Sequence, residues 1–350
     1  MSSASEREAD DEVCASCGRS GCGSIKLRRC NSCKLVKYCG VVCQKNDWQE
    51  HKRICKMIRD KSLFEQPGSR HAGDCPICLL PLSTDVMKST IMVCCSTVIC
   101  DGCSWANNVR EKEEGLESKC PFCREPTPDD HEENYKNNLK RVKANDPAAM
   151  RQMGTFLHAR GDYGGAFKHW QKSAQLGDVD AHYKLSCSHL QGLGVEKNMK
   201  KYLHHLEEAA IGGHAIARHN LGWYELEHGS LERAAKHWII AAKLGYSDTM
   251  DRVQEMFKKA GLGLVDKADY ETSLCAFQDA VDATKSPQRE AAESMKEADA
   301  KMIAADAAMK EAMIAGLFSP MSEAAKAMRK ARAAMVAAEA KMLEAMKLGS

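Results

Sequence analysis

The sequence predicts a mainly α-helical protein that begins with two small, cross-braced, cysteine-rich modules and continues as an α-solenoid and a C-terminal Ala/Met-rich helical hairpin. Three observations support this prediction. Sixteen of the eighteen cysteines lie between positions 14 and 123. Ala-x-x-Gly markers then recur at intervals of 36 and 32 residues, as in helical repeats. The last segment has methionine and alanine at heptad spacing, as in packed helix pairs.

Composition narrows the class of protein. The 350 residues suffice for two or three domains, and the net charge of +2 favours neither nucleic acid nor membrane binding. The first residues are polar and acidic and contain no apolar secretory core. The sequence also has no run of about 18 apolar residues, which is the length needed to span a membrane. A cytoplasmic or nuclear location is therefore expected. Cysteines stay reduced there, which disfavours a disulfide framework.

Changes of composition divide the chain into six segments. We expect a disordered tail, the first cysteine module, a linker, the second cysteine module, the repeat region and the hairpin, at residues 1–12, 14–55, 56–74, 75–124, 145–283 and 288–348.

The first cysteine module has the spacing of metal ligands. Thiolates two or three residues apart can hold one tetrahedral Zn²⁺ from a tight turn. The candidate ligands are Cys14, Cys17, Cys30, Cys33, Cys39, Cys43, His51 and Cys55. The pairs 14/17 and 39/43 can share one ion, and the pairs 30/33 and 51/55 another. Two zinc ions are therefore predicted here, and their binding would supply the folding free energy of a module with little apolar core.

The first module resembles the MYND zinc finger. The likeness rests on Tyr38-Cys39-x-x-x-Cys43-Gln44-x-x-Asp47-Trp48-x-x-His51-Lys52-x-x-Cys55. It implies a protein-interaction module that binds short proline-containing peptides, with Gln44 and Trp48 lining the peptide groove. Core packing is the other role open to Trp48. Some MYND proteins are lysine methyltransferases, but the catalytic domain that follows their finger has no counterpart in this sequence.

The first module is also strongly basic. Residues 14–61 contain twelve Lys and Arg against three Asp and Glu, a net charge of +9. Such a charge would attract acidic partners or a nucleic-acid backbone. Such a charge is more often a solvated face on a module too small to bury anything, and we prefer that interpretation.

The second cysteine module resembles a RING finger through Cys75-Pro-Ile-Cys78, Cys100-x-x-Cys103 and Cys120-Pro-Phe-Cys123-Arg124. The RING arrangement implies that one ion takes Cys75, Cys78, Cys100 and Cys103. The other would take Cys120, Cys123 and two ligands near 94–97. The usual histidine position is Thr97, which is not a zinc ligand. Either Cys94 and Cys95 both bind, or the second site is incomplete, so one or two zinc ions are expected.

The RING resemblance raises the question of enzymatic activity. It implies a ubiquitin ligase that holds a charged conjugating enzyme beside the substrate and acts by proximity. Ile77, Pro121 and Arg124 would contact the conjugating enzyme. Arg124 suits this task because a guanidinium offers several fixed donors. The alternative is a structural module without catalytic function, and the missing histidine favours it.

The repeat region predicts stacked helix–turn–helix units. Its markers are Ala174-x-x-Gly177, Ala210-x-x-Gly213 and Ala242-x-x-Gly245, with a weaker echo at Ala280–Ala283. Each glycine follows a last helical turn, where a left-handed cap needs no Cβ. Because one unit cannot bury its apolar face alone, the units should stack into an α-solenoid. We expect His204, His205, His214 and His219 to be polar surface or groove residues, and Cys187 and Cys275 to be buried.

Further residues of the repeat region resemble the Sel-one-like repeat, a relative of the tetratricopeptide repeat. The likeness is carried by Gly192-Leu-Gly194, Lys200-Lys201 and Glu207-Glu-Ala-Ala-x-x-Gly213. The order of a RING-like module and Sel-one-like repeats resembles a protein family of diatoms and related algae. The resemblance implies a concave surface that binds other proteins.

The last segment predicts an antiparallel helical hairpin. Methionines are seven residues apart, at Met295, Met302 and Met309 and again at Met321, Met328, Met335 and Met342. An alanine follows each of them by three residues, which makes an Ala-lined heptad seam. Two separate helices are the alternative, because alanine favours helix in either case and buries little area.

Two functions follow from these patterns. In the first, the chain is a RING-type ubiquitin ligase whose MYND finger and repeats recruit substrates. In the second, it is a non-catalytic adaptor that binds proline-containing peptides and other proteins. Both need zinc and protein partners.

Overall fold

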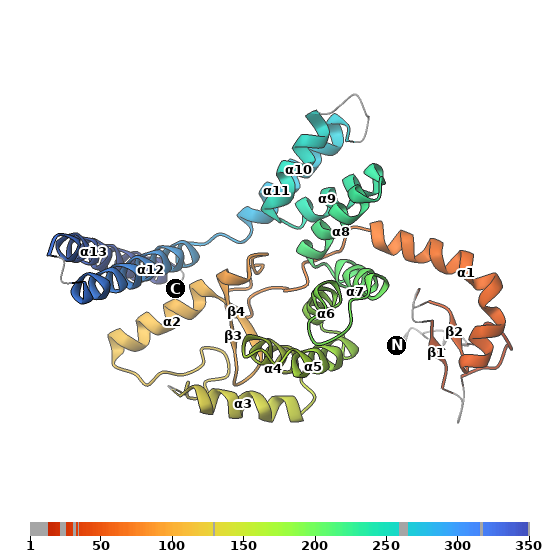
Figure 1. Ribbon diagram of the computed structural model, residues 1–350, viewed down its shortest axis with the longest axis horizontal. Helices are drawn as coiled ribbons and strands as arrows, with labels where there is room; N and C mark the ends of the chain where they lie inside the picture. Colours follow the sequence, from red (N-terminus) through yellow and green to blue (C-terminus); the bar gives the residue numbers. More distant parts are fainter. Residues whose placement is uncertain are drawn as a thin grey trace, which may run out of the picture. The chain divides into compact units, whose positions relative to one another are not determined.

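The computed structural model describes residues 13–21, 26–30, 33, 35–128, 130–258, 265–315 and 318–348, of which 131, 318–322 and 348 are described by their backbone alone. The expected tail and Cys22 lie outside this part of the chain. As predicted, the fold is mainly helical (Figure 1). Contacts divide it into two units, Met1–Gln66 and Pro67–Ser350. Among the described residues, no helix is both long and apolar enough to cross a membrane.

The first unit is built around cysteines. Strand β1 (Arg28–Arg29) pairs antiparallel with β2 (Lys37–Tyr38), and helix α1 (Val41–Phe64) follows. The core consists of four buried cysteines and Tyr38. Tyr38 donates a hydrogen bond to the Asp47 carboxylate, with an oxygen–oxygen distance of 2.5 Å. Burial and this carboxylate both raise the pKa of Tyr38, so the phenol remains a donor.

The second cysteine module combines a small hairpin with one helix. A 3₁₀ turn, η1 (Val86–Lys88), leads into strand β3 (Ser89–Met92), which pairs antiparallel with β4 (Thr97–Cys100). Helix α2 (Asp101–Glu114) starts directly after the second strand and ends at Gly115, whose φ is +62°. Two apolar side chains, Leu82 and Ile99, are buried with the cysteines.

The repeat region is a series of packed helix pairs, which confirms the predicted helix–turn–helix units. After α3 (His131–Lys143), the pairs are α4 (Pro147–Ala159) with α5 (Tyr163–Gln175), α6 (Val179–Gln191) with α7 (Met199–Ile211), α8 (Ala215–Glu227) with α9 (Leu231–Lys243), and α10 (Ser247–Lys258) with α11 (Lys267–Asp282). Asp or Asn side chains cap many of these helices, for example Asp178 at α6 and Asn198 at α7. The marker glycines Gly177, Gly213 and Gly245 have φ of +95°, +86° and +83°, as expected for left-handed caps.

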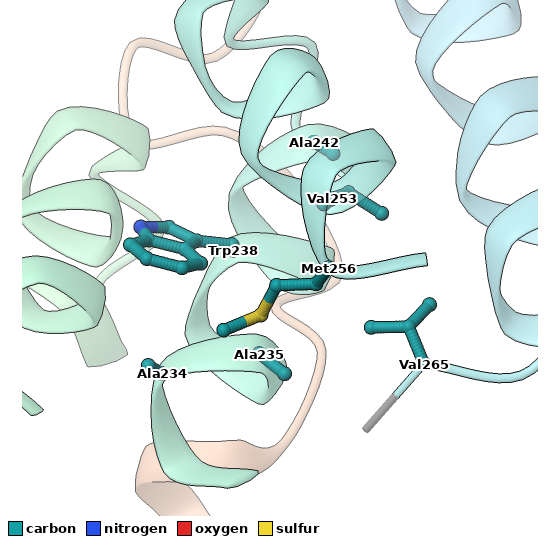
Figure 2. Close-up of a cluster of buried hydrophobic side chains, with 7 residues drawn as sticks. All are labelled: Ala234, Ala235, Trp238, Ala242, Val253, Met256 and Val265. Atoms are coloured by element: carbon teal, nitrogen blue, oxygen red, sulfur yellow. The ribbon is translucent and has the colours of Figure 1, made fainter. Parts of the chain in front are cut away.

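Tryptophans fill the space between paired helices. Trp238 of α9 is 2% exposed, and Figure 2 shows it among small and aliphatic side chains that include Ala234, Val253 and Met256. Its indole Nε1 donates to the carbonyl oxygen of His219 at 3.1 Å. In α5, Trp170 makes the equivalent bond to Arg151 at 3.2 Å. These anchors hold the two helices of a unit together.

The last two helices form the predicted hairpin. They are α12 (Pro287–Ile314) and α13 (Phe318–Leu348), which lie side by side (Figure 1). The seam alanines are buried, at Ala298, Ala305, Ala312, Ala324, Ala331, Ala338 and Ala345. One end of the hairpin also packs on α2, where Val109 shares a core with Ala291, Met295 and Met342. This docking was not predicted from the sequence.

Two minor expectations are wrong. His214 is 4% exposed and belongs to the interior, because it caps α8 and packs between Tyr183 and His71. Cys275 is exposed on α11 and not buried as predicted. Cys187 is partly buried.

Candidate metal centres

The sixteen predicted ligands gather into four groups. Within each group the ligand atoms all lie within 4.8 Å of one another. The groups are Cys14, Cys17, Cys39 and Cys43; Cys30, Cys33, His51 and Cys55; Cys75, Cys78, Cys100 and Cys103; and Cys94, Cys95, Cys120 and Cys123. We name them centres 1, 2, 3 and 4 in this order. The interleaved grouping is the one that the sequence suggested for the first module.

Distances in the first module suit tetrahedral zinc. A Zn–S bond of about 2.3 Å makes neighbouring sulfurs about 3.8 Å apart in a tetrahedron. In centre 1, the Cys39 sulfur is 3.7 Å from that of Cys17 and 3.4 Å from that of Cys43. In centre 2, the sulfurs of Cys30 and Cys55 are 3.8 Å apart.

The histidine of centre 2 is placed by its helix. His51 and Cys55 are one turn apart on α1, so both side chains face the same side. His51 directs Nε2 to the Cys33 sulfur at 3.5 Å. In a zinc tetrahedron, the edge between an imidazole nitrogen and a thiolate sulfur has about this length. The donor set of three thiolates and one imidazole is typical of structural zinc.

The second module shows the same geometry. In centre 3, the sulfurs of Cys75 and Cys103 are 3.8 Å apart, and those of Cys78 and Cys100 are 3.7 Å apart. Backbone N–H groups donate to two of these sulfurs, from Cys100 to Cys75 and from Cys103 to Cys100, each at 3.4 Å. Such donors stabilise a thiolate, which is the form that binds a metal.

Centre 4 bears on the alternative that the sequence left open. The Cys95 sulfur is 3.9 Å from that of Cys120, and the Cys94 sulfur is 3.3 Å from that of Cys123. A tight turn allows adjacent cysteines to converge, because Ser96 has φ of +58° and donates its N–H to the Met92 carbonyl. Thr97 starts β4 and lies outside the group. The structure therefore supplies four sulfurs without the histidine.

A groove crosses the second module. Its volume is about 1150 Å³, and it is lined by loops of centres 3 and 4, by α2 and by the hairpin. The three predicted conjugating-enzyme contacts, Ile77, Pro121 and Arg124, all line it, and Ile77 is 41% exposed. Asn107, which was not predicted from the sequence, also lines the groove, and its Nδ2 donates to the Lys119 carbonyl at 3.2 Å. Its position one turn after Cys103 on α2 was a usable signal.

A second groove of about 400 Å³ lies along α1. Trp48, which is 39% exposed, lines it with four basic side chains, and none of the described lining residues is acidic. The basic residues are Lys52, Arg53, Lys56 and Arg59. The predicted partner of Trp48, Gln44, is not among the lining residues. Its Nε2 lies 3.8 Å from the Cys30 sulfur, so the structure places it beside centre 2.

A fifth group, His71, Asp180 and His214, also has metal-ligand residue types. Its hydrogen bonds disfavour a metal. Nδ1 of His214 accepts from the Ala217 amide at 3.2 Å, so its Nε2 carries the proton and faces the Asp180 carboxylate at 3.4 Å. His71 Nε2 lies 2.9 Å from the same carboxylate oxygen. The group therefore joins the linker to α6 and α8.

Asp180 is the charged centre of this group. Burial would raise the pKa of its carboxyl, but hydrogen bonds from His214 and His71 and the positive charge of Arg151 hold that pKa well below its usual range. Arg151 bonds Asp178 at 3.0 Å and approaches Asp180 at 3.5 Å. Asp180 is thus an ionised acceptor for two histidines.

Comparison with known proteins identifies the first module. Residues 14–55 match the MYND finger family model. Human histone-lysine N-methyltransferase SMYD3 is 46% identical over 43 residues, 12% of this chain and 10% of that protein. Protein CBFA2T2 of Xenopus laevis is 40% identical over 50 residues, 14% of this chain and 8% of that protein. Tudor domain-containing protein 1 of Oryzias latipes is 39% identical over 44 residues, 13% and 4% respectively.

The chain therefore contains a MYND finger at 14–55 and spans a tenth or less of these curated relatives. A solved structure titled a Sel1 repeat protein from Oxalobacter formigenes aligns over 53% of this chain and 73% of its own, with 17% identity and a TM-score of 0.35. At that TM-score the likeness carries no argument, so the repeat architecture rests on the helix pairs of this chain.

Proposed function

We propose that this protein is a zinc-dependent protein-interaction scaffold, with Zn²⁺ held by all sixteen ligands of centres 1 to 4. The supporting observation is the placement of an exposed apolar side chain in a groove beside these centres in each module, Trp48 in one and Ile77 in the other. Zinc bound in these centres would fix the loops and helices that line the grooves. The methyltransferase among the relatives matches this chain over 43 residues, which are 10% of its own length.

The lining of the groove on α1 supports a proposal for the partner of the finger. Trp48 offers an apolar face on which a proline ring can stack, and its neighbours Lys52 and Lys56 add positive charge. A proline-containing peptide with flanking Asp or Glu residues fits this chemistry. Gln44, beside Cys30, would contribute through the position of the loop at centre 2.

Peptide binding to the zinc-loaded full chain tests this partner. Fluorescence anisotropy would compare proline-containing peptides with acidic and with neutral flanks. Trp48→Ala should weaken both by tenfold or more, whereas Lys52→Glu with Lys56→Glu should weaken only the acidic peptide and reduce its salt dependence. Lys61→Glu changes an α1 charge outside the groove and serves as control. Equal loss with the control variant, or no preference for acidic flanks, would contradict the proposal.

A second candidate function is RING-type ubiquitin ligation. One observation favours it: Ile77, Pro121 and Arg124 come from two different loops and line one groove. A ligase of this kind forms no covalent bond with ubiquitin and accelerates transfer by orientation. Arg124, which directly follows a ligand of centre 4 and has φ of +62°, would donate to the conjugating enzyme and ubiquitin.

Autoubiquitination assays with a panel of conjugating enzymes separate ligase from adaptor. Wild type should transfer ubiquitin, and Ile77→Ala and Arg124→Ala should reduce transfer by tenfold or more. Leu79→Ala is a matched control, because Leu79 is 74% exposed but does not line the groove. No transfer by wild type with any enzyme of the panel would leave the adaptor function alone.

A further inference from the structure

An arginine of the hairpin reaches the metal loop of centre 3. Arg289 lies in the first turn of α12, 211 residues after Cys78 in the sequence. Its Nη2 donates to the Cys78 sulfur at 3.3 Å and to the Leu80 carbonyl at 3.0 Å. Its Nη1 donates to the Pro81 carbonyl at 2.6 Å. One guanidinium thus binds a predicted ligand sulfur and the backbone that follows it.

The surroundings of Arg289 are shaped for this contact. A Cβ at Gly102 would lie 2.8 Å from the Arg289 backbone nitrogen and 2.9 Å from its Cγ, so the first turn of α2 admits the arginine only because residue 102 has no side chain. Nη1 also donates to the Thr284 carbonyl at 2.9 Å, and Ser286 caps α12 at the Arg289 amide. These contacts with the residues just before α12 hold the arginine in place.

Further ion pairs hold α12 against the module. Lys296 forms a short hydrogen bond to the Asp101 carboxylate, next to a ligand of centre 3. Lys88 pairs with Glu293 at 2.8 Å. Together with the apolar contact between Val109 and Met295, they align the helix with the metal loop. The position of Arg289 is therefore set by several independent contacts.

The charge balance explains what the arginine does. Four thiolates around one Zn²⁺ carry a net charge of about −2, which burial makes unfavourable unless donors and cations surround it. A charged N–H···S hydrogen bond stabilises the thiolate, and the two carbonyl bonds keep the Cys78 loop in its metal-binding conformation. Loss of the arginine would leave both the thiolate charge and the loop less well held.

We propose that α12 is a structural part of centre 3, in which Arg289 acts as a positioning residue that slows the release of Zn²⁺. The proposal rests on zinc occupancy of this centre, as in the proposed function. Docking of the hairpin and metal retention are then coupled, and each stabilises the other. The hairpin also contributes Gln288 and Met346 to the adjacent groove, so this coupling would set the shape of the partner site.

The test uses the zinc-loaded full chain and a chelator challenge. Pulsed alkylation with mass spectrometry reports the exposure of each cysteine separately. Arg289→Met replaces most of the aliphatic part of the side chain and removes its donors, and it should speed alkylation of the four cysteines of centre 3 by tenfold or more. Arg289→Lys, which keeps the charge but not the planar fork of donors, should give an intermediate rate. Arg332→Met, at an exposed arginine of α13, is the matched control.

The outcomes are distinct. Faster alkylation confined to centre 3 supports the proposal. Wild-type rates in Arg289→Met overturn it, and so does equal acceleration in the MYND finger, which would indicate general destabilisation. If wild-type centre 3 is already unprotected without chelator, the proposed zinc function of this module fails instead.

A second measurement follows the hairpin and not the metal, and its first part needs only the wild-type protein, so it remains informative if Arg289→Met folds poorly. Hydrogen exchange in α12 of wild type should rise at least severalfold when zinc is removed. In Arg289→Met, exchange in α12 should be faster with zinc present and should change little on its removal. A zinc effect as large as in wild type would overturn the coupling.

Discussion

Gly222 and Trp238 lie so close that a Cβ on the glycine would stand 2.3 Å from the indole Nε1. Gly154 and Trp170 repeat this relationship, with a distance of 2.5 Å. Both pairs are sixteen residues apart (238 minus 222, and 170 minus 154), and both indoles donate to a carbonyl nineteen residues earlier. Neither glycine has a positive φ, so what these positions require is space for a tryptophan.

Gly222→Ala should therefore destabilise the repeat region although alanine favours helix. The methyl group has to displace Trp238, and such overpacking costs about 1–3 kcal/mol. Urea unfolding followed by tryptophan fluorescence and circular dichroism would measure the loss. Gly164→Ala is the matched control, because a Cβ there meets only one atom, at 3.9 Å. That variant should be neutral or gain up to about 1 kcal/mol from helix propensity. Equal stability of the two variants would refute the packing argument.

Asp180→Asn should weaken the attachment of the linker to the repeats. Both histidines face one carboxylate oxygen, and the other oxygen lies 3.5 Å from Arg151 Nε, so an amide whose oxygen still accepts from the histidines would turn its N–H group toward the guanidinium. The variant also loses the negative charge, and buried unmatched donors cost about 1–3 kcal/mol. The pKa of Asp180 is lowered in the fold, so its contribution is complete at neutral pH and is lost only as the pH falls below the unfolded value of 3.8. Denaturation at about pH 7 measures the difference.

Asp282→Asn provides the comparison for Asp180→Asn. Asp282 pairs with Lys285 at 2.7 Å on an exposed surface. Exposed ion pairs contribute little to stability, so this variant should lie close to wild type. A loss in Asp180→Asn no larger than in this control would show that the charge of Asp180 is not needed to hold the linker.

The sequence predicted what local spacing determines. The grouping of Cys14, Cys17, Cys39 and Cys43 follows from ligand intervals, because each pair must meet another pair to complete a tetrahedron. The alanine seam could be predicted from the heptad spacing, because residues seven apart lie on the same face of a helix. Both the zinc-like clusters and the helical hairpin could be predicted in this way.

Contacts between distant segments could not be predicted in this way. Arg289 and Cys78 are 211 residues apart, and neither belongs to a pattern that refers to the other. The sequence predicts a surface or groove position for His214, whereas its burial comes from its capping role and its partner His71, which depend on the fold of the linker. Centre 4 could be predicted only in part. The sequence shows the adjacent Cys94 and Cys95, but whether both reach one ion depends on the turn at Ser96.

The histidines between α6 and α7 should make stability depend on pH. Nδ1 of His182 lies 3.1 Å from Nδ1 of His205. Burial first, and then the neighbouring His182, His204, His189 and Lys201, lower the pKa of His205 to about 3. The unfolded pKa is 6.5. The neutral imidazole therefore contributes stability above that value, and the contribution is lost as the pH falls below it.

His205→Gln should remove this dependence. At about pH 7.5 the variant should be equal to or less stable than wild type, and at about pH 5.5 it should gain at most about 1.4 kcal/mol relative to wild type. Thermal unfolding of both proteins at both pH values gives the difference, in which acid effects on the metal centres cancel. The exposed neighbour His204→Gln should change the dependence less. A gain at pH 5.5 that is equal in the two variants would contradict the role of His205.

Zinc content tests whether centre 4 works without a histidine. Four groups of ligands predict four zinc ions per chain. Cys95→Ser should lower this to three, because the Cys95 sulfur faces Cys120 at 3.9 Å and a serine hydroxyl is a much poorer zinc ligand. Thr97→Val alters the position where a RING finger carries its histidine, but Thr97 lies outside the cluster, so the variant should keep four ions. Metal analysis with native mass spectrometry counts them. Three ions in wild type would show that centre 4 is incomplete, and four in Cys95→Ser would show that the ion there does not depend on Cys95.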